Sequence, residues 1–235
     1  MNPTNPWPWR WAGRVHALAW REDRKFLQAS VKFFNRLTTK YPDDAQAWSE
    51  FAQLRWLQNS ESPSDMLIGS ACNAFEKAIG LGIEDSAVFY DRFGHALQEQ
   101  GMLVRAEEAH RKAYELDQDT AYCLGVCLIT QGKYDEGLPY VLHDAESVHR
   151  DSRGWFQVAI CHAECGRFEE AETAYRKALH MNPDYAHAWY NFGGLYWNEG
   201  KKRRAARIWR KAVAKFPDFE RAEEVRRVLA VLDLL

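Results

Sequence analysis

Two consecutive stretches near the C-terminal end decide the fold. They are residues 152–185, SRGWFQVAICHAECGRFEEAETAYRKALHMNPDY, and residues 186–219, AHAWYNFGGLYWNEGKKRRAARIWRKAVAKFPDF. Each is 34 residues long, and written one beneath the other they carry the same or a closely similar residue at six positions. The six pairs are Trp155 and Trp189, Gly166 and Gly200, Ala171 and Ala205, Tyr175 and Trp209, Ala178 and Ala212, and Pro183 and Pro217. Because tryptophan, glycine and proline are each a small share of an average sequence, these matches indicate an internal repeat.

The pattern inside each stretch predicts two helices joined by a tight turn. Trp189, Phe192, Gly193 and Tyr196 follow one another at i, i+3, i+4 and i+7, which is the spacing of one helical face. A glycine follows each first helix, where a residue with positive φ can end it. A proline follows each second helix and cannot continue it.

The same spacing continues upstream with lower fidelity. The unit at residues 45–85 holds seven extra residues, which we place in an exposed loop at 59–65. The sequence therefore predicts, in order, a Trp/Pro-rich N-terminal arm and first helix (1–23), the second helix of an eroded repeat (24–44), a repeat with an insertion (45–85), a short repeat (87–117), a degenerate repeat (118–151), two well-matched repeats (152–185 and 186–219) and a capping helix (220–235).

These residues resemble the tetratricopeptide repeat, whose pattern is W-x2-L-G-x2-Y followed by Gly, Ala, an aromatic residue, Ala and Pro over 34 residues. The resemblance covers about residues 45–219 and is most specific in the last two units. It implies an all-α, right-handed superhelical solenoid of antiparallel helix pairs. One pair cannot bury its apolar face alone, so stacked neighbours share a continuous core. Small residues such as Gly94, Gly125 and Gly193 would let the two helices of a pair approach closely, and Trp155 and Trp189 are expected in the core.

Composition excludes several other classes of protein. The chain has 235 residues, of which 46% are hydrophobic and 14% aromatic, so it is not intrinsically disordered overall. A formal net charge of −2 disfavours a globally basic nucleic-acid binder. We find no run of about 18 apolar residues and expect no transmembrane segment. Five cysteines without a disulfide framework are typical of a reduced compartment, so we expect a cytoplasmic protein.

No catalytic motif is found, and we expect no enzyme activity, no cofactor, no metal and no small-molecule substrate. The cysteines need a separate argument. Cys123 and Cys127 are four residues apart, as are Cys161 and Cys165, whereas zinc sites favour pairs with two intervening residues. Cys127 and Cys161 hold the same repeat position, which indicates packing as small apolar residues. A thiol- or metal-dependent enzyme that uses these four cysteines is kept as the weaker alternative.

The resemblance implies that the first helix of each unit lines a concave groove that holds a peptide or a helix of a partner. Carried onto this chain, the family's groove positions give a partner-binding set of Tyr122, Val126, Ile129, Phe156, Ile160, Tyr190, Asn191 and Trp197. The aromatic members would be the anchors. The alternative is that neighbouring helices cover these aromatic rings. The predicted function is a non-catalytic adaptor or scaffold for protein partners, and the second hypothesis is a structural scaffold that self-assembles through its ends as a homo-oligomer.

Charge is distributed unevenly along the chain. Residues 201–217 hold eight basic residues and no acidic one, whereas residues 115–151 hold eight acidic residues and two basic ones. The basic run falls on a second helix, so a solvated outer face is the simplest interpretation. An acidic protein partner or a second copy of the chain are the alternatives. Nucleic acid is disfavoured because stacking aromatic residues are not interleaved with the run.

Overall fold

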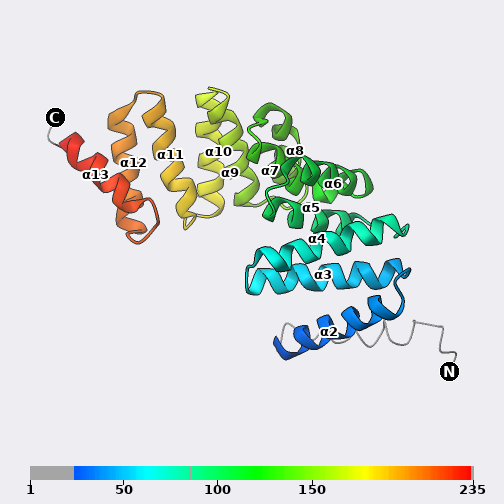
Figure 1. The fold of residues 1–235 in the computed structure, drawn as a ribbon. Helices are drawn as coiled ribbons and strands as arrows, with labels where there is room; N and C mark the ends of the chain where they lie inside the picture. Colours follow the sequence, from blue (N-terminus) through cyan, green and yellow to red (C-terminus); the bar gives the residue numbers. More distant parts are fainter. Residues whose placement is uncertain (1–23, 85, 234–235) are drawn as a thin grey trace. The chain divides into compact units, whose positions relative to one another are not determined.

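The computed structural model describes residues 24–84 and 86–233, which divide into two compact units within residues 1–120 and 121–235. The described residues form twelve α-helices and one short 3-10 helix, with no strand among them (Figure 1). The N-terminal unit contains α2 (Arg24–Lys40), α3 (Ala45–Glu61), α4 (Asp65–Gly80), α5 (Ala87–Glu99), α6 (Leu103–Leu116) and η1 (Gln118–Thr120). The C-terminal unit contains α7 (Ala121–Thr130), α8 (Tyr134–Glu146), α9 (Ser152–Glu164), α10 (Phe168–Met181), α11 (Ala186–Asn198), α12 (Lys202–Lys215) and α13 (Ala222–Asp233).

Consecutive helices pack as pairs: α3 with α4 and α5 with α6 in one unit, and α7 with α8, α9 with α10 and α11 with α12 in the other. In the C-terminal unit we call α7, α9 and α11 the first helices and α8, α10 and α12 the second helices. The all-α fold of helix pairs predicted from the sequence is confirmed.

Glycine closes the turn within each pair, as predicted. Gly166 has φ = 73° and Gly200 has φ = 79°, a backbone region that residues with a Cβ rarely adopt. The residue after each glycine donates its N–H back into the last turn of the first helix, from Arg167 to the carbonyl of His162 at 2.8 Å and from Lys201 to the carbonyl of Tyr196 at 2.8 Å. These bonds satisfy carbonyl groups that the helix end leaves open.

Glycines inside the first helices allow close packing of the second helices, which confirms the sequence argument. A Cβ added to Gly94 would lie 2.6 Å from the ring of His110, and one added to Gly125 would lie 2.6 Å from Val141. A Cβ added to Gly193 would lie less than 3.0 Å from the indole of Trp209. In all three pairs the contacting residue lies sixteen positions after the glycine. One repeat position therefore holds the glycine, and a second repeat position holds the side chain that packs against it.

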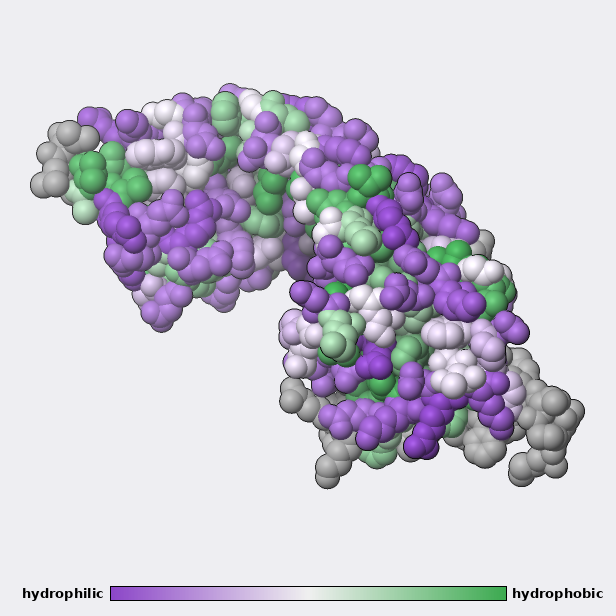
Figure 2. All heavy atoms as spheres, viewed as in Figure 1, coloured by the Kyte–Doolittle hydropathy of each residue, from purple (hydrophilic) through white to green (hydrophobic). Residues whose placement is uncertain are grey.

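The core of the C-terminal unit joins its helix pairs and extends onto α13. Ala171, Ala178, Ala205 and Ala212 are all fully buried on the second helices. On α13 an apolar stripe packs against this core: Ala222, Val225, Val228, Leu229 and Leu232. The capping role predicted for this helix is therefore supported by its contacts. The far end of α13 stays exposed, with Val231 59% accessible, and hydrophobic atoms gather there in Figure 2.

The loop predicted at residues 59–65 is shorter than predicted: residues 62–64 form an exposed connection, whereas residues 59–61 and 65 are helical. Helix α3 continues to Glu61 and α4 already begins at Asp65, so the extra residues lengthen both helices. Asn59 is buried and explains why the helix continues. Its amide donates to the Glu99 carboxylate at 2.7 Å, and its Oδ1 accepts the backbone N–H of Ser64 at 2.8 Å.

The N-terminal arm and the first helix predicted within 1–23 lie outside the described residues, as do Leu234 and Leu235. Over the part of the chain that the structure describes, no helix combines the length and the apolar character needed to cross a membrane.

Candidate functional site

The first helices of the C-terminal unit, together with α13, form a face that contains a pocket of about 420 Å³. Three helices supply most of its lining: Ile160, Ala163 and Glu164 from α9, Asn191, Gly194, Leu195, Trp197 and Asn198 from α11, and Arg221, Glu224, Val225 and Val228 beside and on α13. Tyr175 and Trp209 reach it from the second helices. The capping helix therefore contributes one wall of the pocket as well as covering the core.

The 34-residue spacing explains why these residues meet. Ile160, Gly194 and Val228 hold the same repeat position, and Asn191 and Val225 share another. Repeated positions on successive first helices point to the same face of a stacked array. Continuing the repeat register past residue 219 places Val225 and Val228 in the pocket, a signal that the interpretation of the last helix as a cap leaves unused.

The pocket combines an apolar floor with a polar rim. Aliphatic and indole side chains form the floor, whereas Glu164, Asn191, Asn198, Arg221 and Glu224 bring polar atoms to it. Arg221 is fixed there, since its Nη1 donates to Oδ1 of Asn191 at 2.8 Å and its Nε lies 3.9 Å from a carboxylate oxygen of Glu224. An apolar cavity with a few oriented polar groups is the usual form of a ligand-binding site.

Six of the eight predicted partner-binding residues are partly accessible to solvent: Tyr122, Val126, Ile129, Ile160, Asn191 and Trp197. Three of these six line the pocket: Ile160, Asn191 and Trp197. The three residues of α7 lie outside it, further along the same series of first helices.

The expectation of accessible side chains is wrong for Phe156 and Tyr190. Phe156 is 7% exposed and Tyr190 is fully buried. The Tyr190 hydroxyl donates to the carbonyl of Phe216 at 3.0 Å, and its backbone carbonyl accepts the indole N–H of Trp209 at 2.9 Å. Both rings are core residues, which is the alternative that the sequence had left open.

Aromatic residues at the last position of the repeats 152–185 and 186–219 cover these two rings. The ring centroids of Phe156 and Tyr185 are 5.0 Å apart, and those of Tyr190 and Phe219 are 4.7 Å apart. Both pairs are separated by 29 residues in the sequence. Burial raises the pKa of the Tyr185 hydroxyl to about 12, in keeping with a ring held against the core. An aromatic residue at the end of a repeat is therefore the sequence signal that would have identified the buried rings.

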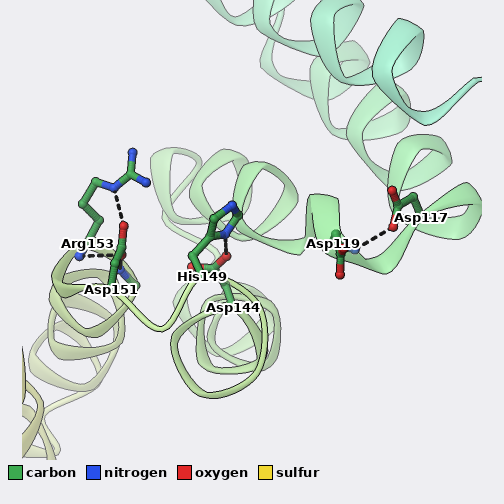
Figure 3. Close-up of polar contacts among 7 residues, drawn as sticks. Asp117, Asp119, Asp144, His149, Asp151 and Arg153 are labelled. Atoms are coloured by element: carbon green, nitrogen blue, oxygen red, sulfur yellow. Dashed lines mark hydrogen bonds and ion pairs between the residues drawn. The ribbon is translucent and has the colours of Figure 1, made fainter.

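Tyr122 holds the same repeat position but lacks this cover. The corresponding last position is Asp151, which caps the N-terminus of α9 by accepting the backbone N–H groups of Arg153 at 2.9 Å and Gly154 at 3.1 Å. The guanidinium of Arg153 pairs with Asp151 at 2.7 Å (Figure 3). The same guanidinium lies 5.8 Å from the centroid of the Tyr122 ring. Burial favours the protonated form of Asp151, but the hydrogen bonds from Arg153 and Gly154 outweigh it and hold its pKa below the ordinary value.

The loop before α9 is fixed by a second carboxylate, the buried Asp144 of α8. Its Oδ1 hydrogen-bonds to Nδ1 of His149, and its backbone carbonyl accepts N–H groups from the same loop (Figure 3). The adjacent Arg150 has φ = 50°, an uncommon backbone conformation for a residue with a side chain. These contacts position the start of α9 and so the side chains that this helix brings to the pocket.

Trp155 and Trp189 are less buried than predicted. Both are half-exposed at the edge of the core, and the Trp189 indole donates to the carbonyl of Pro183 at 2.9 Å. Trp155 lies beneath the ammonium group of Lys177, 3.6 Å from the ring centroid. These indoles cover the preceding loop and the second helix, so the large cost expected for removing a fully buried ring does not apply to them.

Two of the four cysteines of the C-terminal unit pack as small apolar side chains, whereas Cys123 and Cys165 are partly accessible. Cys127 and Cys161 are fully buried on α7 and α9 at the same repeat position. Burial raises the pKa of the Cys161 thiol to about 12, so it is protonated and unreactive at neutral pH.

Comparison with known proteins agrees with this architecture. A model for the TPR repeat matches residues 162–200, and a tetratricopeptide repeat model matches residues 187–218. Residues 162–218 therefore match tetratricopeptide repeats, and these matches support a protein of the tetratricopeptide repeat family. Members of this family are generally non-catalytic interaction modules, and the family and the fold support a protein–protein interaction scaffold.

Two curated relatives are 26% identical to this repeat protein. They are the tetratricopeptide repeat-containing protein trd-1 of Caenorhabditis elegans, aligned over 48% of the chain, and superkiller complex protein 3 of Mus musculus, aligned over 88%. The chain spans only 15% and 13% of the lengths of these two proteins.

Solved structures support the fold. YrrB, described as a TPR protein with an unusual peptide-binding site, superposes with a TM-score of 0.65 at 24% identity, covering 83% of this chain and 97% of YrrB. MamA from Desulfovibrio magneticus gives a TM-score of 0.64 at 15% identity, covering 74% of this chain and 97% of that one.

Proposed function

We propose that this protein is a non-catalytic adaptor whose C-terminal unit binds a peptide or helix of a partner protein along α7, α9, α11 and α13. The observation that carries the proposal is the pocket of about 420 Å³ that α9, α11 and α13 line together. Interfaces of this type gain most of their energy where one large side chain fills a desolvated pocket. The pocket has room for one such side chain, and Ile160 and Val228 supply apolar contact surface.

Gly194 makes the centre of the pocket accessible. A Cβ added there would meet no atom within 4 Å, so the glycine leaves space that any side chain would occupy. Trp197, one turn further along α11, adds a half-exposed indole to the same pocket. Indoles are frequent in binding surfaces because they combine a large apolar area with few rotatable bonds.

The rim favours a particular type of ligand. Glu164 and Glu224 are exposed acidic residues of the lining, whereas the cation of Arg221 is already bonded to Asn191 and lies close to Glu224. A partner segment that places one apolar side chain in the pocket and a lysine or arginine beside it would match both the floor and the rim.

The test is a selection from a random peptide display library with the full chain as bait, followed by mapping of the selected peptides. Hydrogen exchange of the complex should show protection on α9, α11 and α13. The enriched peptides should share an apolar residue next to a basic one. Protection confined to α10 and α12, or no enrichment, would contradict the proposal.

Self-assembly through the ends and cysteine chemistry are the competing functions. Light scattering coupled to size exclusion should give the mass of a monomer at all concentrations tested. An oligomer that grows with concentration would favour the structural scaffold. Stoichiometric metal in the purified protein would favour the enzyme hypothesis built on Cys123, Cys127, Cys161 and Cys165.

A further inference from the structure

A separate charged surface lies on α12, away from the pocket of the first helices. This helix carries seven basic side chains and no acidic one: Lys202, Arg203, Arg204, Arg207, Arg210, Lys211 and Lys215. All seven are exposed, because Ala205, Ala206, Trp209 and Ala212 form the buried face of the helix. The run of positive charge found in the sequence is therefore presented to solvent.

Part of this charge converges on a hollow of about 420 Å³ between the second helices. Its lining consists of Glu172 and Arg176 from α10, Tyr196 from α11, and Arg203, Arg204 and Arg207 from α12. We call this set the arginine hollow. It shares no residue with the pocket of the first helices.

Two of its arginines are held in place by neighbouring groups. Arg176 donates to Oε1 of Glu172 through Nε at 3.0 Å and through Nη2 at 2.8 Å. The guanidinium of Arg204 lies 5.7 Å from the centroid of the Tyr196 ring. Such contacts reduce the entropy that a side chain loses when it binds a ligand.

The remaining charge of the hollow is not compensated. Burial favours the protonated form of Glu172, but the hydrogen bond from Arg176 outweighs it and holds the pKa of this carboxyl below its ordinary value. Among the residues that the structure describes, no carboxylate forms an ion pair with Arg203 or Arg207. Four guanidinium groups thus face one carboxylate, and an added anion would relieve their repulsion.

We propose that the arginine hollow is a second binding site, which takes an acidic segment of a partner protein and seats a side-chain oxyanion between Arg203 and Arg207. Arginine suits this ligand because its planar fork binds carboxylate and phosphate groups in a bidentate manner. Nucleic acid fits less well, since Tyr196 is the one aromatic ring of the hollow and is only 2% exposed, which leaves no face for a base to stack on.

The test uses the full chain, three fluorescent peptides and a fluorescent single-stranded oligonucleotide. The peptides are hexaglutamate, the same peptide with a central phosphoserine, and hexaglutamine as the neutral control. Fluorescence anisotropy at low and physiological salt gives their affinities. The variant Arg203→Gln/Arg207→Gln removes two cations from the hollow. Lys202→Gln/Lys211→Gln removes two cations from the same helix outside the hollow and is the matched control. All substituted side chains are exposed, so far-UV circular dichroism should be unchanged.

The expected result is binding of the acidic peptides but not of hexaglutamine, weakened at least tenfold by Arg203→Gln/Arg207→Gln and less than threefold by the lysine control. The ratio between the glutamate and phosphoserine peptides identifies the preferred oxyanion. Four results would overturn the proposal: no binding of either acidic peptide, equal losses in both variants, tighter binding of a single-stranded oligonucleotide, or self-association of the chain that Arg203→Gln/Arg207→Gln abolishes.

Discussion

Gly193 and Gly194 are neighbours on α11, but a methyl group added at Gly193 would lie in a packed core and one added at Gly194 would lie in open space. At Gly193 the new Cβ would lie less than 3.0 Å from the indole of Trp209, whereas at Gly194 it would meet no atom within 4 Å. The Trp209 indole has little freedom to move away, because it is 5% exposed and its Nε1 donates to the carbonyl of Tyr190 at 2.9 Å. We therefore predict that Gly193→Ala destabilises the protein and Gly194→Ala stabilises it.

The magnitudes follow from the same contacts. Overpacking a core costs about 1–3 kcal/mol, and displacing the indole would also weaken a hydrogen bond worth about 1 kcal/mol. Replacing glycine by alanine inside a helix by itself stabilises the folded state by about 0.5–1 kcal/mol. The net effect of Gly193→Ala is a loss of roughly 1–3 kcal/mol, whereas Gly194→Ala keeps the helix gain of about 0.5–1 kcal/mol alone.

Urea unfolding followed by circular dichroism measures both variants beside the original chain. The midpoints should fall on opposite sides of the original value, with unchanged slopes. The reasoning is refuted if Gly193→Ala is as stable as Gly194→Ala, because the indole of Trp209 would then move without cost and the glycine would not be needed for the helices to approach.

Three further predictions concern side chains that fix the C-terminal unit. Tyr190→Ala should lower the free energy of unfolding by about 3–5 kcal/mol because it removes a buried ring. Tyr190→Phe should lower it by about 1 kcal/mol because it removes only the hydrogen bond to Phe216. Equal effects of the two variants in urea unfolding would argue against a core role. His149→Ala should cost about 1–3 kcal/mol because the buried Asp144 loses its side-chain partner, and unchanged thermal unfolding would contradict this. Asp151→Ala should cost about 1 kcal/mol at neutral pH by removing the cap of α9. The folded-state pKa of Asp151 lies below its ordinary value of 3.8. The stabilisation by the cap is therefore fully present at pH values above 3.8 and is lost as the pH falls through the folded-state pKa. A stability difference between the variant and the original chain that persists in acid would contradict this prediction.

The sequence predicts the helix pairs well because the decisive signals are local. Gly200 predicts a turn with positive φ, and Pro217 predicts the end of a helix. Gly193 predicts close packing against the residue sixteen positions later, Trp209. Each signal acts within one repeat, where the 34-residue spacing fixes its neighbours.

The wrong predictions involve contacts between residues 29 to 40 positions apart, which the local helical pattern does not show. The Ser- and Pro-containing segment at 59–65 has the composition of a loop, but the contact between Asn59 and Glu99, forty residues apart, supports a longer helix. The repeat position of Tyr122, Phe156 and Tyr190 was assigned to the groove, although an aromatic residue 29 positions later covers the ring in two of these three repeats. Phe156 and Tyr190 have this cover and Tyr122 does not, so one position has two different environments.

The most direct test of the proposed groove is the affinity of one selected peptide for three versions of the full chain. Gly194→Leu places a side chain in the open space of the pocket, and Ala214→Leu adds the same side chain at an exposed position on α12 as the control. We predict that Gly194→Leu weakens binding at least tenfold, while Ala214→Leu leaves the affinity within twofold of the original chain. Binding that Gly194→Leu leaves intact would show that the partner does not enter the pocket formed by α9, α11 and α13.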